Sequence, residues 1–321
     1  MGNARPPLSL SEILGRTAFI YRNNFLLLIS IAAIDACSML AFELLSLYLT
    51  QYNVPGKIFY IFLLEIPMIF ILPVLVHSAL CQAVAWVHLD QSVSFRRTFA
   101  HVLPKLSRYV WLIFLTGLRI LWPILLFLPL AIFLVPGVVP ISTTFKVILG
   151  IATAVCAIGF FVYIVWMSLR YALSMPACVL EDLKASAALR RSVSLTKGQL
   201  WNVFVLFLIV GCIALVGMIV MHLPVALFGS GNVFFHPERL SPGLRVLTYL
   251  LNSVYNMFMV PVYSALITIF YYDRRVCLEG FGAEPIAEAE ISASSQVELV
   301  TDESSELLDP SEADDHNSNG L

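Results

Sequence analysis

The chain has 321 residues, of which 59% are hydrophobic and 12% charged. Soluble domains carry about 25% charged residues, so this composition argues against an ordinary water-soluble protein. The net charge of −2 hides an asymmetry, because all 19 Lys and Arg residues lie at or before Arg275 whereas 12 of the 21 acids follow it.

Six apolar stretches are each long enough to cross a bilayer, which takes roughly 20 residues in a helix. They do not alternate apolar and polar residues as barrel strands do. The predicted fold is therefore all-α, an integral membrane bundle of six transmembrane helices with three amphipathic interfacial helices in residues 1–282. The predicted spans are residues 25–49, 58–86, 109–135, 145–173, 201–228 and 244–272.

A short basic motif recurs before each odd-numbered span. Leu14-Gly15-Arg16-Thr17 aligns with Phe95-Arg96-Arg97-Thr98 and with Leu189-Arg190-Arg191-Ser192. The recurrence predicts a pseudo-threefold repeat in which each unit is an amphipathic surface helix followed by two spans. Repeats in membrane proteins often surround a pathway or pocket. Duplicated architecture without a pathway is the alternative.

Arginines at the inner interface are candidate lipid contacts. Arg16, Arg97 and Arg191 occupy one repeat position, and Arg170 lies near the end of the fourth span. A guanidinium group suits phosphate oxygens, so these residues are candidates to contact the headgroups of anionic lipids. Ordinary interfacial anchoring is the alternative.

Two opposite charges lie inside spans at matching depth. Asp35 is ten residues into the first span and Arg119 ten residues into the third, about 15 Å at 1.5 Å per residue. Each charge alone costs roughly 2.5–3.5 kcal/mol in the membrane, so we expect an intramembrane ion pair. Such a pair acts either as a staple between helices or as a gated, substrate-binding pair.

A second polar group is predicted in the outer half of the membrane. Glu43, Glu65 and His222 lie at similar depth and form a candidate outer cluster. The alternative is that these side chains reach the outer interface individually.

The basic residues also predict an orientation. Segments on one side of the predicted spans hold 13 Lys and Arg residues and those on the other side hold four, which places both termini in the cytoplasm. Residues 283–321 are acidic and lack aromatic residues, so we expect a disordered cytoplasmic tail that folds back on the basic face or binds a soluble partner.

The sequence shows no catalytic motif, such as GxSxG, HExxH or a P-loop. The six cysteines form no CxxC pair, so we expect no metal site and no cofactor. Nucleic acid is not expected as a partner, because the basic residues flank membrane spans where lipid is nearer.

Two stretches carry a family resemblance. The first comprises Arg170-Tyr171-Ala172, Pro176-Ala177, Glu181, Ala188-Leu189-Arg190-Arg191-Ser192, Leu195, Gly198 and Trp201. The second comprises Tyr272-Asp273-Arg274-Arg275 and Glu279-Gly280-Phe281.

Together these stretches resemble the bacterial membrane proteins related to the membrane domain of glycerophosphoryl diester phosphodiesterase. Arg274, where Leu is more usual, and Gly282, where an acid is usual, depart from the pattern. The resemblance implies a six-helix domain in the bacterial cytoplasmic membrane. It does not extend to phosphodiesterase activity, because we expect only the acidic tail to follow.

Three functions compete on this basis. A non-enzymatic scaffold or anionic-lipid-interacting protein fits the basic surface helices. A transporter or permease-like protein for a small solute or lipid fits the intramembrane charges and the prolines within spans. A membrane enzyme acting on lipid is the least supported, because no interface gathers His, Asp or Glu residues.

Overall fold

The computed structural model describes residues 8–52, 54–124, 142–228 and 240–279. Within these residues the chain forms helices and no strand, which confirms the all-α class. The α-helices are α1 (Leu10–Asn23), α2 (Phe25–Gln51), α3 (Lys57–Ile66), α4 (Leu72–His88), α5 (Phe95–Val102), α6 (Leu106–Leu121), α8 (Thr143–Tyr171), α9 (Ser174–Leu180), α10 (Ala185–Thr196), α11 (Leu200–Phe228) and α12 (Pro242–Glu279). A π-helix η1 (Pro67–Ile71) joins α3 to α4, and a 3-10 turn η2 (Leu103–Lys105) joins α5 to α6.

Five helical stretches are long and apolar enough to cross a membrane. They are Phe25–Gln51, Lys57–His88, Val147–Leu180, Leu200–Leu227 and Pro242–Glu279. These stretches correspond to five of the six predicted spans. The other predicted span, residues 109–135, begins in α6 and continues into residues outside those described, so the count of six stays a prediction.

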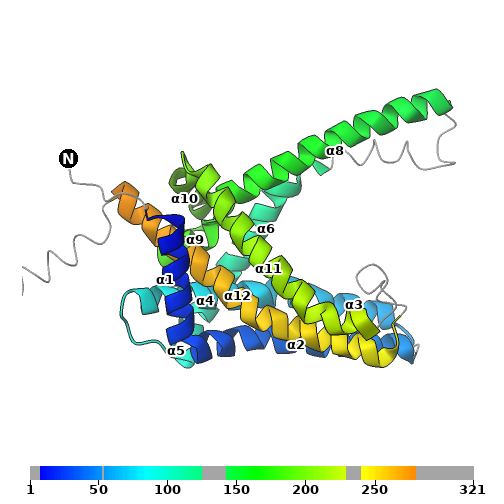
Figure 1. Cartoon of the computed structure of the whole chain (residues 1–321), viewed down its shortest axis with the longest axis horizontal. Helices are drawn as coiled ribbons and strands as arrows, with labels where there is room; N and C mark the ends of the chain where they lie inside the picture. Colours follow the sequence, from blue (N-terminus) through cyan, green and yellow to red (C-terminus); the bar gives the residue numbers. More distant parts are fainter. Residues whose placement is uncertain (1–7, 53, 125–141, 229–239, 280–321) are drawn as a thin grey trace, which may run out of the picture. The chain divides into compact units, whose positions relative to one another are not determined.

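The first surface helix begins where the sequence signals it. The backbone N–H of Glu12 donates to the hydroxyl of Ser9, and the Glu12 carboxylate accepts the backbone N–H of Ser9 at 2.7 Å. This capping box satisfies two backbone donors at the start of α1. The helix ends at Asn24, where the chain changes direction into α2 (Figure 1).

A change of helical pitch divides the second spanning stretch. Pro67 has no backbone N–H to continue the α-helical pattern, and the backbone follows the wider π-helix η1 from this residue to Ile71. π-helical turns often occur at functional sites, so this segment is of interest for a binding cavity.

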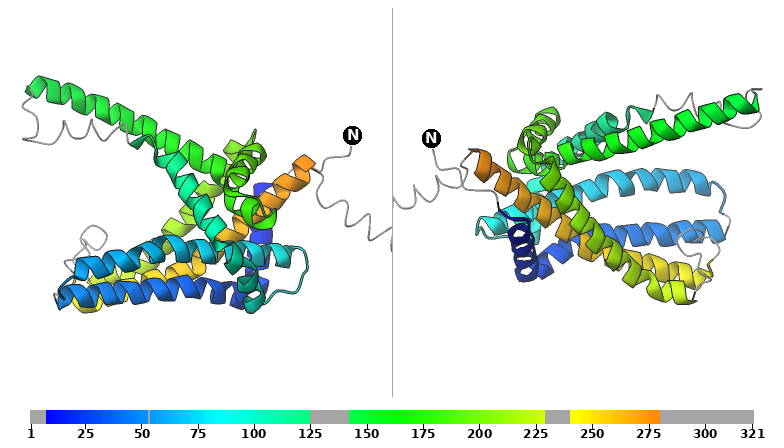
Figure 2. Two further views of the ribbon diagram at one scale, coloured as in Figure 1. Left: turned by 180° about the vertical axis from the view of Figure 1, so that it is seen from behind. Right: turned by 45° about the horizontal axis from the view of Figure 1, so that its top comes forward.

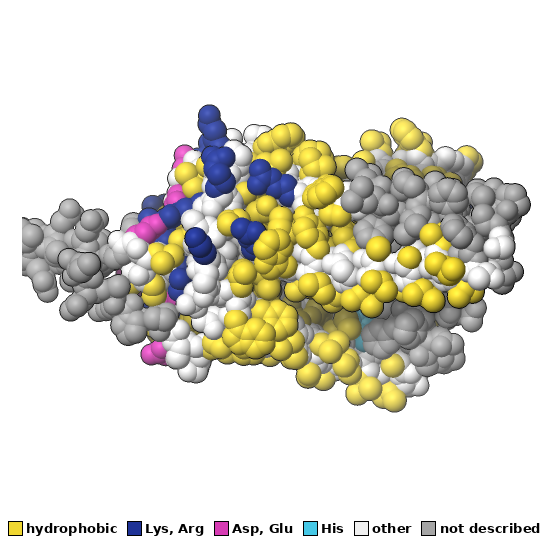
Figure 3. All heavy atoms as spheres, turned by 90° about the horizontal axis from the view of Figure 1, so that it is seen from above, with side chains coloured by type: hydrophobic (Ala, Val, Ile, Leu, Met, Phe, Trp, Pro, Cys, Tyr) yellow, Lys and Arg dark blue, Asp and Glu magenta, His cyan; other side chains and the backbone are white. Residues whose placement is uncertain are grey.

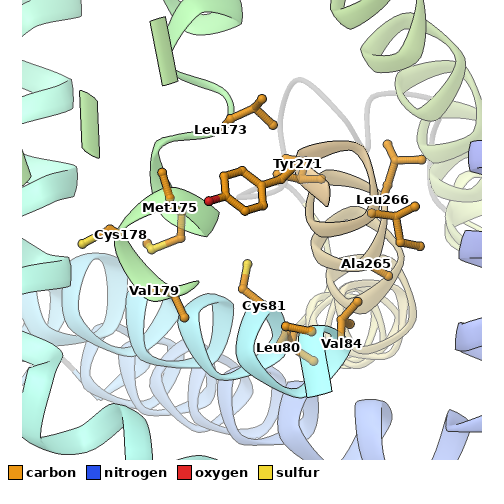
Figure 4. Close-up of a cluster of buried hydrophobic side chains, with 14 of the residues drawn as sticks. Leu80, Cys81, Val84, Leu173, Met175, Cys178, Val179, Ala265, Leu266 and Tyr271 are labelled. Carbon is orange, nitrogen blue, oxygen red and sulfur yellow. The ribbon is translucent and has the colours of Figure 1, made fainter. Parts of the chain in front are cut away.

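The buried core lies where α4, α9 and α12 meet (Figure 4). The buried face of α4 contains small residues such as Ser78, Ala79 and Cys81, which let neighbouring helices approach closely. α2 and α12 lie side by side (Figure 2), and the hydroxyl of Ser253 donates to the carbonyl of Ala36 at 2.6 Å.

The chain divides into two units. Leu8–Arg274 forms one compact unit, and the second comprises Met1–Pro7 and Arg275–Leu321. Within the second unit the structure describes the last turns of α12, where Arg275 pairs with Glu279 at 3.5 Å. Residues 283–321, the predicted disordered tail, lie outside the described residues.

Candidate functional site

The three short helices that carry the recurrent motif bury the same position. Thr17 in α1, Thr98 in α5 and Ser192 in α10 are all buried. The first two hydroxyls donate to carbonyls one turn earlier in their own helices, and Ser192 donates to the carbonyl of Arg170 at 2.7 Å. The Ser or Thr of the motif is therefore a buried packing residue. The arginine that precedes it lies on the same short helix. The threefold relation between the units stays a prediction.

Two of the four candidate headgroup arginines lie over tryptophan rings. The guanidinium of Arg97 is 4.6 Å from the ring centre of Trp86, and that of Arg170 is 4.6 Å from the ring centre of Trp166. Arg97 also donates to the hydroxyl of Ser92 at 3.0 Å. Such cation–π contacts hold an arginine at an interface and leave part of its edge exposed.

Arg191 has a different role, because a carboxylate already holds it. Its guanidinium donates two parallel hydrogen bonds to Glu181, at 2.9 and 3.0 Å, and the Tyr271 hydroxyl donates to the same carboxylate. Only 23% of the Arg191 side chain and 16% of the Glu181 side chain are exposed. The pair therefore links α10 to α12 and leaves less of the guanidinium for a phosphate.

Arg16 is exposed and, within the described residues, forms no ion pair, hydrogen bond or ring contact. Glu12, one turn earlier in α1, already binds Ser9, and that hydrogen bond holds the pKa of Glu12 below its usual value. Among the four predicted headgroup contacts, Arg16 lines a cavity.

That cavity has a volume of about 640 Å³ and lies between α1 and the end of α4. Its polar wall consists of Arg16, Asn23, Asn24, His88, Asp90 and Gln91. The ring of His88 lies 5.1 Å from the ring of Tyr272 of α12, centre to centre, with the two planes tilted by 37°. Exposed Phe19 lines the same opening and supplies an apolar contact next to the arginine.

Basic side chains gather toward one end of the described residues in the view of Figure 3. We use the name basic end for the part of the molecule formed by α1, α5, η2, α6 and α10 that carries Arg16, Arg97, Lys105, Arg108 and Arg191.

The loop after α9 holds one side of the basic end together. Asp182 pairs with Lys105 at 2.9 Å and with Arg108 at 2.6 Å. The hydrogen bond from Lys105 and the two positive charges hold the pKa of Asp182 below its usual value.

The two stretches that carry the family resemblance contact each other at the basic end. The Arg274 guanidinium donates to the carbonyl of Leu195 at 3.3 Å, and the Asp273 carboxylate accepts the backbone N–H of Leu8 at 2.9 Å. Together with the Glu181–Tyr271 hydrogen bond, these contacts join α12 to α10 and to the start of α1. Much of the motif is thus structural.

The structure does not form the predicted ion pair between Asp35 and Arg119. Asp35 Oδ1 is buried and, among the described residues, has no hydrogen-bond partner. Arg119 lies in the last turn of α6, where its carbonyl accepts the hydroxyl of Tyr163 of α8 at 3.0 Å, whereas α2 packs on α4 and its Ala36 carbonyl accepts Ser253 of α12.

Asp35 instead faces a cavity of about 260 Å³ within the apolar part of the molecule. His77 of α4 lines the same cavity, with Phe70 of η1 and Val260 of α12. His77 lies beside Tyr263 at 5.3 Å, and its Nδ1 lies 3.0 Å from the hydroxyl of Ser264. The sequence prediction missed His77, although an isolated histidine in an apolar run is a signal that could have been followed.

The residues of the predicted outer cluster have separate surroundings. Glu43 is half-buried and faces Asn252 of α12. His222 is buried in α11, with Nδ1 2.9 Å from the carbonyl of Met218 in the same helix. Glu65 is half-buried in α3, two residues before η1 begins. The function of this cluster stays a prediction.

Within the described part of the chain, no group of three or more His, Cys, Asp or Glu residues is arranged to hold a metal ion. The six cysteines are free.

Comparison with known proteins gives one match. A family model described as the membrane domain of glycerophosphoryl diester phosphodiesterase matches residues 89–301. No curated protein and no solved structure matches the chain.

Proposed function

We propose that this chain, which belongs to the family of the membrane domain of glycerophosphoryl diester phosphodiesterase, is a non-enzymatic membrane protein. Its role in this proposal is to hold anionic phospholipid headgroups at the basic end. The observation that carries this proposal is the cavity of about 640 Å³ that exposed Arg16 lines together with Asn23, Asn24 and Gln91. The family match supports the non-enzymatic part, because it is to the membrane domain.

The chemistry of the cavity wall suits a phosphodiester. The Arg16 guanidinium supplies paired N–H donors for phosphate oxygens. The amides of Asn23, Asn24 and Gln91 supply further donors and can also accept hydrogen bonds from headgroup hydroxyls. Phe19 provides the apolar contact expected where a headgroup meets an acyl chain.

Asp90 sets a limit on the headgroup. It is an acid in the wall of the same cavity, so it would repel a headgroup that carries several negative charges. A headgroup with a single phosphate charge and neutral hydroxyl groups satisfies both side chains. Phosphatidylglycerol has this chemistry and is the appropriate probe.

Substitution of Arg16 tests the headgroup site. The full-length protein, purified in detergent, is titrated with phosphatidylglycerol, and bound lipid is counted by native mass spectrometry. Arg16→Gln is expected to weaken binding about tenfold, because a charge-assisted hydrogen bond contributes about 1.5–3 kcal/mol and 1.4 kcal/mol is tenfold. Phosphatidylcholine gives the background from a lipid without net charge.

Arg22→Gln is the matched control. Arg22 is exposed on the same helix and carries the same charge, but it does not line the cavity. This variant is expected to bind phosphatidylglycerol like the wild type. Equal weakening by both substitutions would show that the lipid responds to the general positive surface, and the proposal would be withdrawn.

A permease-like function is the second candidate, and the intramembrane cavity beside Asp35 favours it. A π-helix forms part of its wall, and irregular helices within membranes commonly line substrate cavities. Reconstitution in vesicles and measurement of solute uptake separate this function from the first, since a lipid-binding scaffold moves no solute.

A further inference from the structure

We infer that the intramembrane cavity beside Asp35 is a binding site for a small primary ammonium ion with an apolar body. The inference is independent of the headgroup site and does not require that the ligand cross the membrane. It rests on the charge, the hydrogen-bonding groups and the walls of the cavity.

The charge of the site comes from Asp35. A carboxylate in hydrocarbon is costly unless a positive charge or hydrogen-bond donors accompany it. Within the described residues Asp35 Oδ1 has no hydrogen-bond partner, and neither of its oxygens forms an ion pair. A bound cation would therefore supply an interaction that the protein itself does not provide.

His77 adds a second acceptor. The Ser264 hydroxyl lies 3.0 Å from His77 Nδ1 and 3.0 Å from the carbonyl of Val260. A neutral imidazole has one acceptor nitrogen, and in the tautomer that donates to Ser264 through Nδ1 this acceptor is Nε2. Asp35 and His77 thus offer acceptors, which suits a ligand with several N–H donors.

The remaining walls are apolar and select the body of the ligand. Phe70, Ile113, Met175 and Val260 surround the cavity from four elements, η1, α6, α9 and α12. A volume of about 260 Å³ is below the roughly 300–1,000 Å³ of pockets for drug-sized ligands. The site therefore fits a small amine, whose ammonium group can also approach the face of Phe70.

The alternative of an inorganic cation is less compatible with this wall. Metal ions such as Mg²⁺ and Ca²⁺ take six or more oxygen ligands, and the described wall offers one carboxylate among apolar side chains. A primary ammonium ion needs three acceptors at most, and water can serve as the third.

Benzylammonium chloride is the probe, added to the full-length protein in detergent micelles and followed by isothermal titration calorimetry, with empty micelles subtracted. Saturable binding to the wild type is expected, and benzyl alcohol, the uncharged analogue, is expected to bind at least about tenfold more weakly. Asp35→Asn is expected to lose at least the same factor, because it removes the charge at constant size.

Two further variants separate the site from general effects. Glu43→Gln removes a carboxylate from the same helix outside the cavity and is expected to keep the wild-type affinity. Val260→Phe fills the cavity while retaining Asp35 and is expected to abolish binding. The inference is overturned if the wild type shows no saturable binding, if Asp35→Asn binds like the wild type, or if Val260→Phe leaves the affinity unchanged.

Discussion

At the residue scale, equivalent positions of one sequence motif have different partners. Arg191 is held by Glu181, Arg97 lies over Trp86, and Arg16 lines a cavity. The sequence predicts where these arginines lie but cannot predict which of them a carboxylate neutralises. Glu181 is ten residues from Arg191, and Tyr271 reaches it from a helix much later in the chain.

The pair between Glu181 and Arg191 gives a stability prediction. Glu181→Gln leaves a mostly buried guanidinium without its counter-charge and weakens the hydrogen bond from Tyr271. We expect a loss of about 1–3 kcal/mol in the free energy of unfolding. The measurement is a thermal or denaturant unfolding curve of the purified protein in detergent.

Asp182→Asn is the control for that prediction, because it removes the same charge at the adjacent, exposed position. Exposed ion pairs contribute about 0–1 kcal/mol, so the loss should be smaller. The lowered pKa of Asp182 means that its contribution is present at neutral pH and disappears as the pH falls through that pKa. A larger loss for Asp182→Asn than for Glu181→Gln would contradict this ranking.

At the element scale, the sequence predicted most of the helices from length and hydropathy. The capping box at Ser9 and the span beginning at Phe25 agree with the structure. The π-helix after Pro67 was not predicted, because a proline in a membrane helix can be accommodated by a kink, a π-turn or neighbouring groups. The cavity beside Asp35 was missed for a related reason: its wall comes from helices distant in sequence.

A glycine joins the surface helix α10 to the span α11. Gly198 has φ = +79°, a left-handed conformation that ends helices and costs other residues about 1–2 kcal/mol. A Cβ at this position would meet no heavy atom within 4 Å, so an alanine here introduces backbone strain without a steric clash. We expect Gly198→Ala to lower the free energy of unfolding by about 1–2 kcal/mol in detergent.

Gly211→Ala provides the comparison. Gly211 lies within α11 and also has open space around its Cβ position, but its backbone is helical. Alanine is the better helix former by about 0.8–1 kcal/mol, so this variant should be neutral or more stable. If both variants lose similar stability, the turn at Gly198 is not the cause.

At the scale of the whole molecule, the number of crossings decides where the ends of the chain lie. The described residues contain five helices able to cross a membrane, and an odd number of crossings would place the two termini on opposite sides. The sixth predicted span begins in α6, whose 16 described residues are too few to cross alone. The gathering of Lys and Arg at one end favours a single cytoplasmic face (Figure 3).

Reporter fusions to the full-length chain distinguish six crossings from five. Green fluorescent protein fluoresces in the bacterial cytoplasm, whereas alkaline phosphatase becomes active outside it. Because the basic surface helices α1, α5 and α10 each precede a predicted outward span, we expect fluorescence from fusions at either terminus and an inactive phosphatase at the C-terminus. An active C-terminal phosphatase with a fluorescent N-terminal fusion would mean five crossings.

In that case residues 109–135 would not span the membrane, and some of the basic helices would lie on the opposite side from α1. The Arg16 cavity would keep its geometry, but it would no longer lie in the same leaflet as all the other basic residues. Lipid binding by Arg16→Gln therefore tests the cavity itself, and the two fusions test whether all the basic helices lie on one side of the membrane.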